Sequence, residues 1–220
     1  MLAWILFAGS LATAQNYRLF PSHRILTYRH GNILYTVKTD SIAVEGSDTL
    51  FFSQKAFQIW DEYCFDADVR WHPGFVRETS NGDTWLYNLN HDSMLIKTRI
   101  PLNGEWTFFH LEENKIVKAT CSYVFTRDVL GSTDSIKQIV LQVTDTLGNP
   151  VTGHYLNDRI MELSKNHGMT LKFLFRSFPG RDYPLELCGL SNPETGLTAN
   201  AGLFHREIEP DRKSTRLHSS

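Results

Sequence analysis

The sequence predicts an all-β fold, an antiparallel meander that curls into a half-barrel, a barrel or a sandwich, with at most one short helix. Three observations predict it. Apolar and polar residues alternate with period two along most of the chain, which is typical of strands with one buried face. Turns rich in Gly and Asn separate these runs. No helical segments alternate with the strands, so the sheet should be antiparallel.

The first predicted element is a hairpin in which residues 24–30 and 33–38 flank Gly31-Asn32. Gly and Asn tolerate the positive φ of a tight turn, and the alternation on both sides fixes which side chains face inward. One short helix is an alternative to a strand around 56–64, where apolar residues fall at helical spacing. Further strands are predicted over residues 49–53, 75–78, 84–87, 105–109, 116–126, 135–143, 159–163, 169–176 and 185–190.

The clearest strand runs from Ile116 to Thr126 and alternates throughout. Its apolar face is expected to carry Val117, Ala119, Cys121, Tyr123 and Phe125. A second alternating run follows the turn at 165–168. If the sheet is concave, the two apolar faces line a groove for an acyl chain or another apolar ligand. The residues expected to line that groove are Val117, Tyr123, Phe125, Met169, Phe173 and Phe175.

The N-terminal residues 1–14 are predicted to be a signal peptide. An apolar run over 2–11 precedes Ala12-Thr13-Ala14, and small residues at these positions suit cleavage between Ala14 and Gln15, although no Lys or Arg precedes the run. A run of about 10 residues is too short to span a bilayer, so no transmembrane span is expected. The chain is therefore predicted to meet the export machinery and to be secreted, cell-surface or periplasmic.

Residues 15–195 are predicted to form a single all-β domain, and 196–210 a loop or the start of a lost segment. The last ten residues, 211–220, resemble the translation of a common sequencing adapter, with His218 where the adapter encodes Asn. That resemblance implies that the natural chain continues past Pro210.

Composition excludes one class of partner. The chain has 22 Lys and Arg against 24 Asp and Glu, a formal net charge of −2, with the two signs interspersed. Nucleic-acid binding depends on a concentrated basic face, which the sequence does not show. The three cysteines are Cys64, Cys121 and Cys188. A Cys64–Cys121 disulfide is one interpretation and buried free thiols are the other.

No motif in the sequence indicates catalysis, a metal or a cofactor. His110 and Glu112 have the spacing of one half of a zinc-deaminase signature, but the second half does not follow. Asp66 and Asp68 could share one side of an extended segment, a pattern too common to assign a metal. A Gly-x-Ser-x-Gly elbow and a phosphate-binding Gly loop do not occur. A catalytic triad assembled from distant positions would not be visible in sequence.

Aromatic residues are the one positive chemical signal. Four tryptophans fall within fifty residues, with Tyr and Phe between them. Aromatic residues fill the cores of β proteins, but exposed rings on a sheet also stack on sugars, so a glycan-binding or glycan-active module is an alternative function. The tryptophans are Trp60, Trp71, Trp85 and Trp106.

Three short segments resemble the N-terminal region of exported proteins from the phylum Bacteroidota, a class that often ends in a type IX secretion sorting domain. They are Gly104-Glu105-Trp106, the stretch from Leu130-Gly131 to Asp134-Ser135-Ile136-Lys137, and 163–169. The order of strands is also similar to the half-barrel sheets of periplasmic lipoprotein carriers, a fold analogy only. The resemblance implies a structural or binding role, without catalysis, within a secreted or cell-surface protein.

Overall fold

The structure is a computed structural model of the 220-residue chain, and its regular structure is all strand wherever the chain can be described. The described residues are 17–19, 21, 24–31, 33–45, 48–54, 75–88, 92–173, 178–180, 184–191 and 195–196; within them, the side chains of 33–54, 75 and 172–173 are left aside. In this part of the chain, no helix has the length and apolarity needed to cross a membrane.

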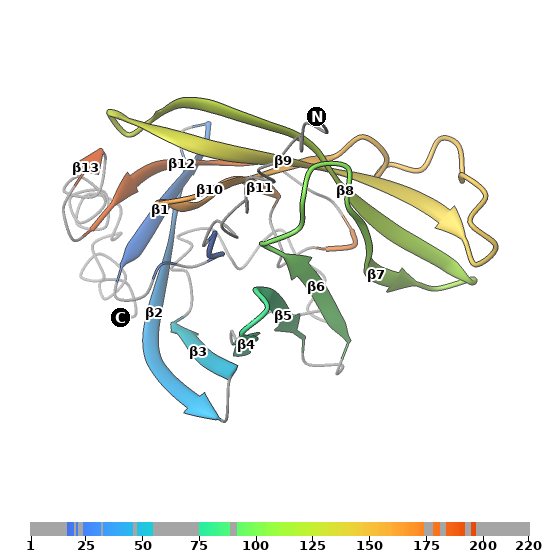
Figure 1. Ribbon diagram of the computed structural model, residues 1–220, viewed down its shortest axis with the longest axis horizontal. Helices are drawn as coiled ribbons and strands as arrows, with labels where there is room; N and C mark the ends of the chain where they lie inside the picture. Colours follow the sequence, from blue (N-terminus) through green and yellow to red (C-terminus); the bar gives the residue numbers. More distant parts are fainter. Residues whose placement is uncertain are drawn as a thin grey trace, which may run out of the picture.

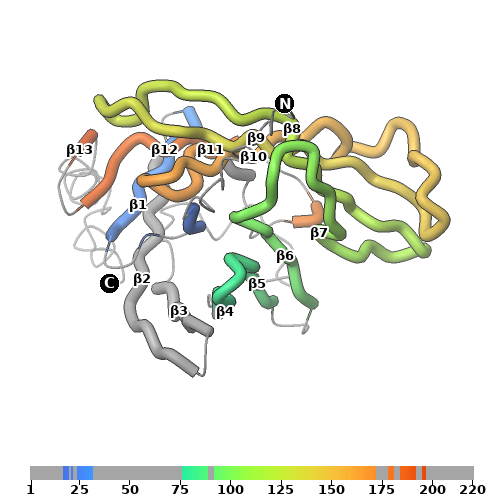
Figure 2. The backbone as a smooth tube through the Cα atoms, viewed as in Figure 1, coloured from blue at the N-terminus to red at the C-terminus, as the bar shows by residue number. Residues whose placement is uncertain are grey.

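Figures 1 and 2 show the path of the chain. Every strand pair in the described residues is antiparallel, which confirms the predicted fold class. The strands are β1 (Ile25–His30), β2 (Ile33–Glu45), β3 (Asp48–Gln54), β4 (Phe75–Glu78), β5 (Asp83–Tyr87), β6 (Ser93–Lys97), β7 (Glu105–Leu111), β8 (Lys115–Val129), β9 (Ser132–Asp145), β10 (Ile160–Ser164), β11 (Gly168–Phe173), β12 (Pro184–Leu190) and β13 (Thr195–Gly196).

The sheet is open. Its strands follow the order β6-β5-β4-β3-β2-β1-β12-β11-β10-β9-β8-β7, with β13 beside β12. Its two ends, β6 and β7, approach each other, and Trp106 Nε1 on β7 donates a hydrogen bond to Leu95 O on β6 at 2.8 Å. No ladder joins β6 to β7 in the described residues, so the barrel among the predicted shapes is excluded.

The longest element is the hairpin of β8 and β9, which forms the upper boundary of the molecule in Figure 1. A two-residue turn joins the strands, with Leu130 and Gly131 at φ of 50° and 84°. Both residues have the positive φ that suits the right-handed twist of the flanking strands. The pairing shifts by one residue between Cys121 and Tyr123, so Ser122 is the extra residue of a β-bulge.

The hydrophobic core lies on one side of this hairpin. Strand β9 contributes Ile139, Leu141 and Val143, all fully buried, as the alternation predicts. Four residues outside the strands also belong to the core, namely Tyr17, Leu19, Leu156 and Phe178. Tyr17 is 1% exposed, and Phe178 packs edge-on against Phe108 and Phe109, with ring centroids 5.7 and 5.1 Å away.

Lys137 also lies on the core side of β9, where its ammonium group fastens the corner between β6 and β7. Its Nζ donates to Thr98 O at 3.0 Å and to Ile100 O at 2.8 Å, and it lies 4.4 Å from the centre of the Tyr17 ring. Burial lowers the pKa of Lys137. The two carbonyls and the ring thus take the place of a counter-ion.

Each predicted strand falls on an observed strand, but β2 extends to Glu45, well past the predicted 33–38, and β8 and β9 are also longer than predicted. Residues 174–176 of the predicted strand 169–176 lie outside the described part of the chain. The sequence did not predict β6 or the two-residue β13. The residues expected to form one short helix or a strand, 56–64, lie outside the described part of the chain.

Candidate functional site

The outer face is defined here as the side of β8, β9 and β10 that points away from the hydrophobic core. Register decides which residues belong to it. Ser164 on β10 lies opposite Ile136 on β9, and Glu162 lies opposite Gln138. Because side chains alternate along a strand, the even-numbered residues of β9 and β10 point outward while Ile139 and Leu163 point into the core. The outer face therefore carries the buried polar residues Asp134 on β9 and Glu162 and Ser164 on β10.

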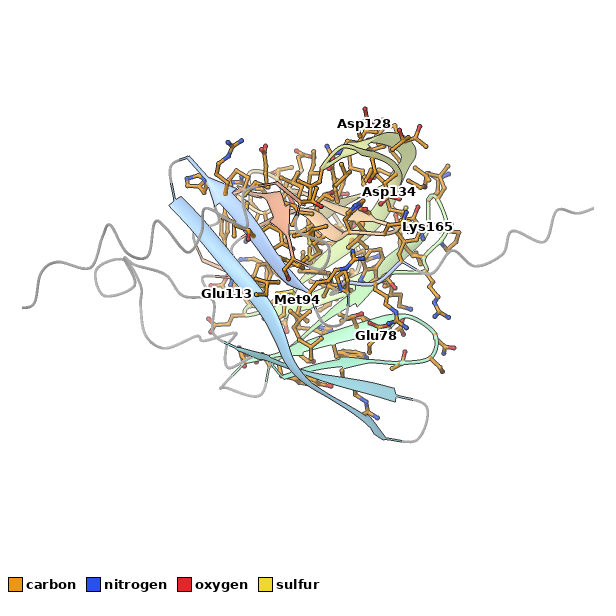
Figure 3. All side chains as sticks on the ribbon, turned by 90° about the vertical axis from the view of Figure 1, so that its left-hand side faces the viewer. Glu78, Met94, Glu113, Asp128, Asp134 and Lys165 are labelled. Atoms are coloured by element: carbon orange, nitrogen blue, oxygen red, sulfur yellow. The ribbon has the colours of Figure 1, made fainter. Side chains whose placement is uncertain are left out.

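The turn between β10 and β11 folds back over the outer face of β9. Lys165 N donates to Ser135 O at 3.0 Å, which holds the start of this turn beside Asp134. Figure 3 shows Asp134 and Lys165 near each other, with Asp128 further along the same hairpin. Residues far apart in sequence are thereby brought onto one carboxylate. The group Asp134, Ser164, Asn166 and His167, with Ser132 beside it, is called the Asp134 cluster.

Both oxygens of Asp134 are occupied by donors. Oδ1 accepts from Ser135 N at 2.8 Å and from Asn166 Nδ2 at 2.9 Å. Oδ2 accepts from Asn166 N and from His167 Nδ1, each at 2.9 Å, and from the Ser164 hydroxyl. The side chain is 1% exposed, so these donors replace the water that a carboxylate would otherwise need.

The same contacts set the charge of Asp134. Burial raises the pKa of this carboxyl, but the hydrogen bonds from Ser164, Asn166, His167 and Ser135 outweigh burial and lower the pKa below its ordinary value. Asp134 is therefore ionised at neutral pH. Its Oδ2 lies 2.9 Å from His167 Nδ1, so in a neutral imidazole the tautomer that donates from Nδ1 leaves Nε2 as an acceptor.

Nε2 of His167 faces a second serine. His167 Nε2 lies 3.4 Å from Ser132 Oγ, so Asp134, His167 and Ser132 form a continuous line. The arrangement follows from strand geometry. Ser132 and Asp134 are two positions apart on one face of β9, so they lie roughly 7 Å apart, a distance that the imidazole of His167 can bridge. Aspartate, histidine and serine in this order are the parts of a hydrolytic triad.

The surroundings of Ser132 favour a structural role for this line. Ser132 Oγ donates to Val129 O at 3.2 Å across the hairpin turn, and the residue is exposed. Acyl transfer needs a desolvated nucleophile with fixed donors for the developing oxyanion. A hydroxyl at the water-exposed end of a hairpin, already hydrogen-bonded to a backbone carbonyl, is poorly placed for that chemistry.

An ion pair lies further along the outer face. Arg127 on β8 reaches across β9, and its Nη2 lies 2.6 Å from Glu162 Oε2. The Glu162 side chain is 7% exposed and that of Arg127 is 42% exposed. The pair therefore keeps the carboxylate neutralised while several guanidinium N–H groups remain open to solvent.

Next to the ion pair, β8 presents two aromatic residues. The bulge at Ser122 places Tyr123 opposite Gln138 and Phe125 opposite Ile136, so both rings belong to the outer face. Tyr123 is 63% exposed, whereas Phe125 is half-buried. Most large aromatic side chains of the described chain are covered, so Tyr123 is unusual.

The predicted apolar groove is divided by this bulge. Val117 and Met169 are fully buried in the hydrophobic core. Tyr123 and Phe125, which the alternation placed on the same face as Val117, lie on the opposite side of the sheet. The side chain of Phe173 and the whole of Phe175 lie outside the described residues. A single groove lined by all six residues is not formed, and binding of an apolar ligand stays a prediction.

The remaining candidates from the sequence are scattered. Cys121 is buried, and because Cys64 lies outside the described residues, their disulfide stays a prediction. Trp106 is buried and Trp85 half-buried. His110 and Glu112 are exposed, and no set of three His, Cys, Asp or Glu residues that could hold a metal occurs in the described chain. The cleavage-site residues and the other candidates lie outside it, namely Ala12, Ala14, Gln15, Trp60, Asp66, Asp68 and Trp71.

Comparison with known proteins adds no identification. No family model matches the chain, and searches of the curated proteins and of the solved structures also find no match. The functional argument therefore depends on the outer face itself.

Proposed function

We propose that this chain is a non-catalytic binding or structural domain of an exported protein. The observation that carries the proposal is that both carboxylate oxygens of Asp134 already accept hydrogen bonds from the protein. This buried carboxylate is the residue best suited to orient a catalytic base, yet both of its oxygens are taken up in fastening the turn between β10 and β11 to β9. The Asp134 cluster thus holds the turn between β10 and β11 against β9.

Export is part of the same proposal, and the packing of the first described residues supports it. Tyr17 lies two positions after Gln15, the first residue after the proposed cleavage point, and is 1% exposed. Its hydroxyl makes a 2.7 Å hydrogen bond with Ser135 Oγ. Cleavage after Ala14 would leave every described contact intact. The expected destination is the cell surface, the periplasm or the medium.

Reactivity of Ser132 tests the non-catalytic part of the proposal. The full chain is incubated with a fluorophosphonate, which phosphonylates activated serines with loss of fluoride, and the labelled peptide is sought by mass spectrometry. We expect no labelling of Ser132 and no hydrolysis of p-nitrophenyl acetate above that of Ser132→Ala. Labelling at Ser132 that is lost in His167→Gln would contradict the proposal and make the line from Asp134 to Ser132 a working triad.

The export part is tested separately by N-terminal sequencing. The chain is expressed with its own leader in a bacterium that exports proteins, and the product is recovered from outside the cytoplasm. We expect Gln15 as the first residue. Retention of the uncleaved chain in the cytoplasm would count against export.

A further inference from the structure

We propose that the outer face binds a glycan, with the ring of Tyr123 as the surface on which a sugar stacks and the Arg127–Glu162 pair as its hydrogen-bonding neighbour. The inference rests on the proposed function as a binding domain and gives that function a ligand class. It also goes beyond the sequence alternative, which placed glycan binding on the four tryptophans and the tyrosines near them, and not on Tyr123.

The first argument is geometric. Beyond the bulge at Ser122, residues Tyr123, Phe125 and Arg127 follow one another on the outward side of β8. Successive side chains on one face of a strand are roughly 7 Å apart, so the three residues form a row about as long as a short oligosaccharide. The ladder to β9 continues to the end of the hairpin and holds the row in place.

The second argument is chemical. A pyranose has a C–H face that is apolar and a rim of hydroxyl groups that need hydrogen-bond partners. Tyr123, at 63% exposure, offers a flat ring with a polar tip. Arg127 is 42% exposed and uses one nitrogen on Glu162, so the guanidinium keeps donors for sugar hydroxyls. Gln138, directly opposite Tyr123, adds an amide.

The balance of polar and apolar groups favours a sugar over a protein partner. A stable protein interface covers about 800 Å² on each side around an apolar centre. On the outer face the exposed apolar groups are few, chiefly Tyr123 and Ile160 at 63% and 39% exposure. An amide and an ion pair stand close to them. One ring surrounded by hydrogen-bonding groups matches a sugar in size and polarity.

Calorimetric titration of the full chain tests the inference, with cellohexaose, laminarihexaose and chitohexaose as probes. We expect at least one hexasaccharide to bind, and Tyr123→Ala to weaken its affinity about tenfold or more, since a central aromatic residue carries much of the energy of such a contact. Tyr123→Phe, which keeps the ring, should bind within a few fold of the wild type.

Tyr155→Ala is the matched control, because Tyr155 is 47% exposed but lies in the connection between β9 and β10. It should bind like the wild type. Three results would overturn the inference: no binding of any hexasaccharide, an equal loss in both alanine variants, or self-association of the wild type that Tyr123→Ala abolishes, which points to a protein partner. Absent glycan binding together with an unreactive Ser132 would overturn this inference and leave the proposed function standing.

Discussion

Replacing Asp134 by Asn removes the charge from the Asp134 cluster, which joins β9 to the β10–β11 turn, while keeping the shape of the side chain. The amide would offer one oxygen where two now accept, and its NH₂ group would face donors that include Asn166 and His167. A hydrogen bond to a charged acceptor is worth roughly 1.5 to 3 kcal/mol, and leaving a buried donor unpaired costs about 1 to 3 kcal/mol. Because such terms are not additive, we expect the unfolding free energy to fall by about 3 kcal/mol.

The assay is equilibrium unfolding in urea, followed by tryptophan fluorescence and circular dichroism. The pH dependence gives a second readout. The pKa of Asp134 is lowered in the folded chain, so its contribution is fully present above the ordinary pKa of an aspartate, near 3.8, and is lost as the pH falls through the lower folded value. The difference in unfolding free energy between wild type and variant should therefore shrink in acid.

Asp128→Asn is the matched control on the same hairpin. The Asp128 carboxylate is exposed and accepts from Thr133 Oγ1 at 2.7 Å, so its replacement should change stability far less. If Asp134→Asn were as stable as this control, or if its destabilisation were the same at pH 7 and in acid, the ionised carboxylate of Asp134 would not be what holds the β10–β11 turn to β9, and the reasoning would be refuted.

Two further substitutions test the polar groups on the core side. Glu78 Oε2 and Thr84 Oγ1 are buried on paired residues and have no hydrogen-bond partner within the described chain, while Glu78 Oε1 lies 3.8 Å from Nε of the exposed Arg18. Burial raises the pKa of Glu78 despite the charges of Arg18 and Arg99, so Glu78→Gln should raise the unfolding free energy by about 1 kcal/mol at pH 7, and this gain should fade in acid. A urea titration that shows no gain at neutral pH would contradict the reasoning. Lys137→Met should lower the unfolding free energy by about 2 to 3 kcal/mol, because two buried carbonyls lose their donor; a melting temperature equal to that of the wild type would show that the corner between β6 and β7 does not need Lys137.

The fold could be predicted because alternation is a local signal. In β9, Ile139, Leu141 and Val143 face inward, and the structure buries all three. The pattern failed at β6, where Met94, Leu95 and Ile96 are consecutive apolar residues that conceal the period of two. Met94 and Ile96 are fully buried while Leu95 is half-buried, so the alternation exists in space but not in hydrophobicity.

The Asp134 cluster could not be assembled from sequence, although its residues lie in segments that the sequence analysis singled out. Asp134 and His167 are separated by 33 positions, and they meet only because β9 pairs with β10 in the register that sets Ser164 opposite Ile136. A shift of one residue would turn Ser164 to the other face. The available signal was a serine two positions before an aspartate on an outward face, followed by a polar turn that includes a histidine.

The bulge at Ser122 is the step that connects the register of the β8–β9 hairpin to the proposed binding surface. Without an extra residue, strict alternation from Val117 would place Tyr123, Phe125 and Arg127 on the same face as Val117. With the extra residue, Arg127 faces outward and pairs with Glu162, and Tyr123 and Phe125 turn outward with it. The exposure of Tyr123 on the outer face is then a consequence of the same register change that brings Arg127 to Glu162, which is why the aromatic row and the ion pair occur side by side.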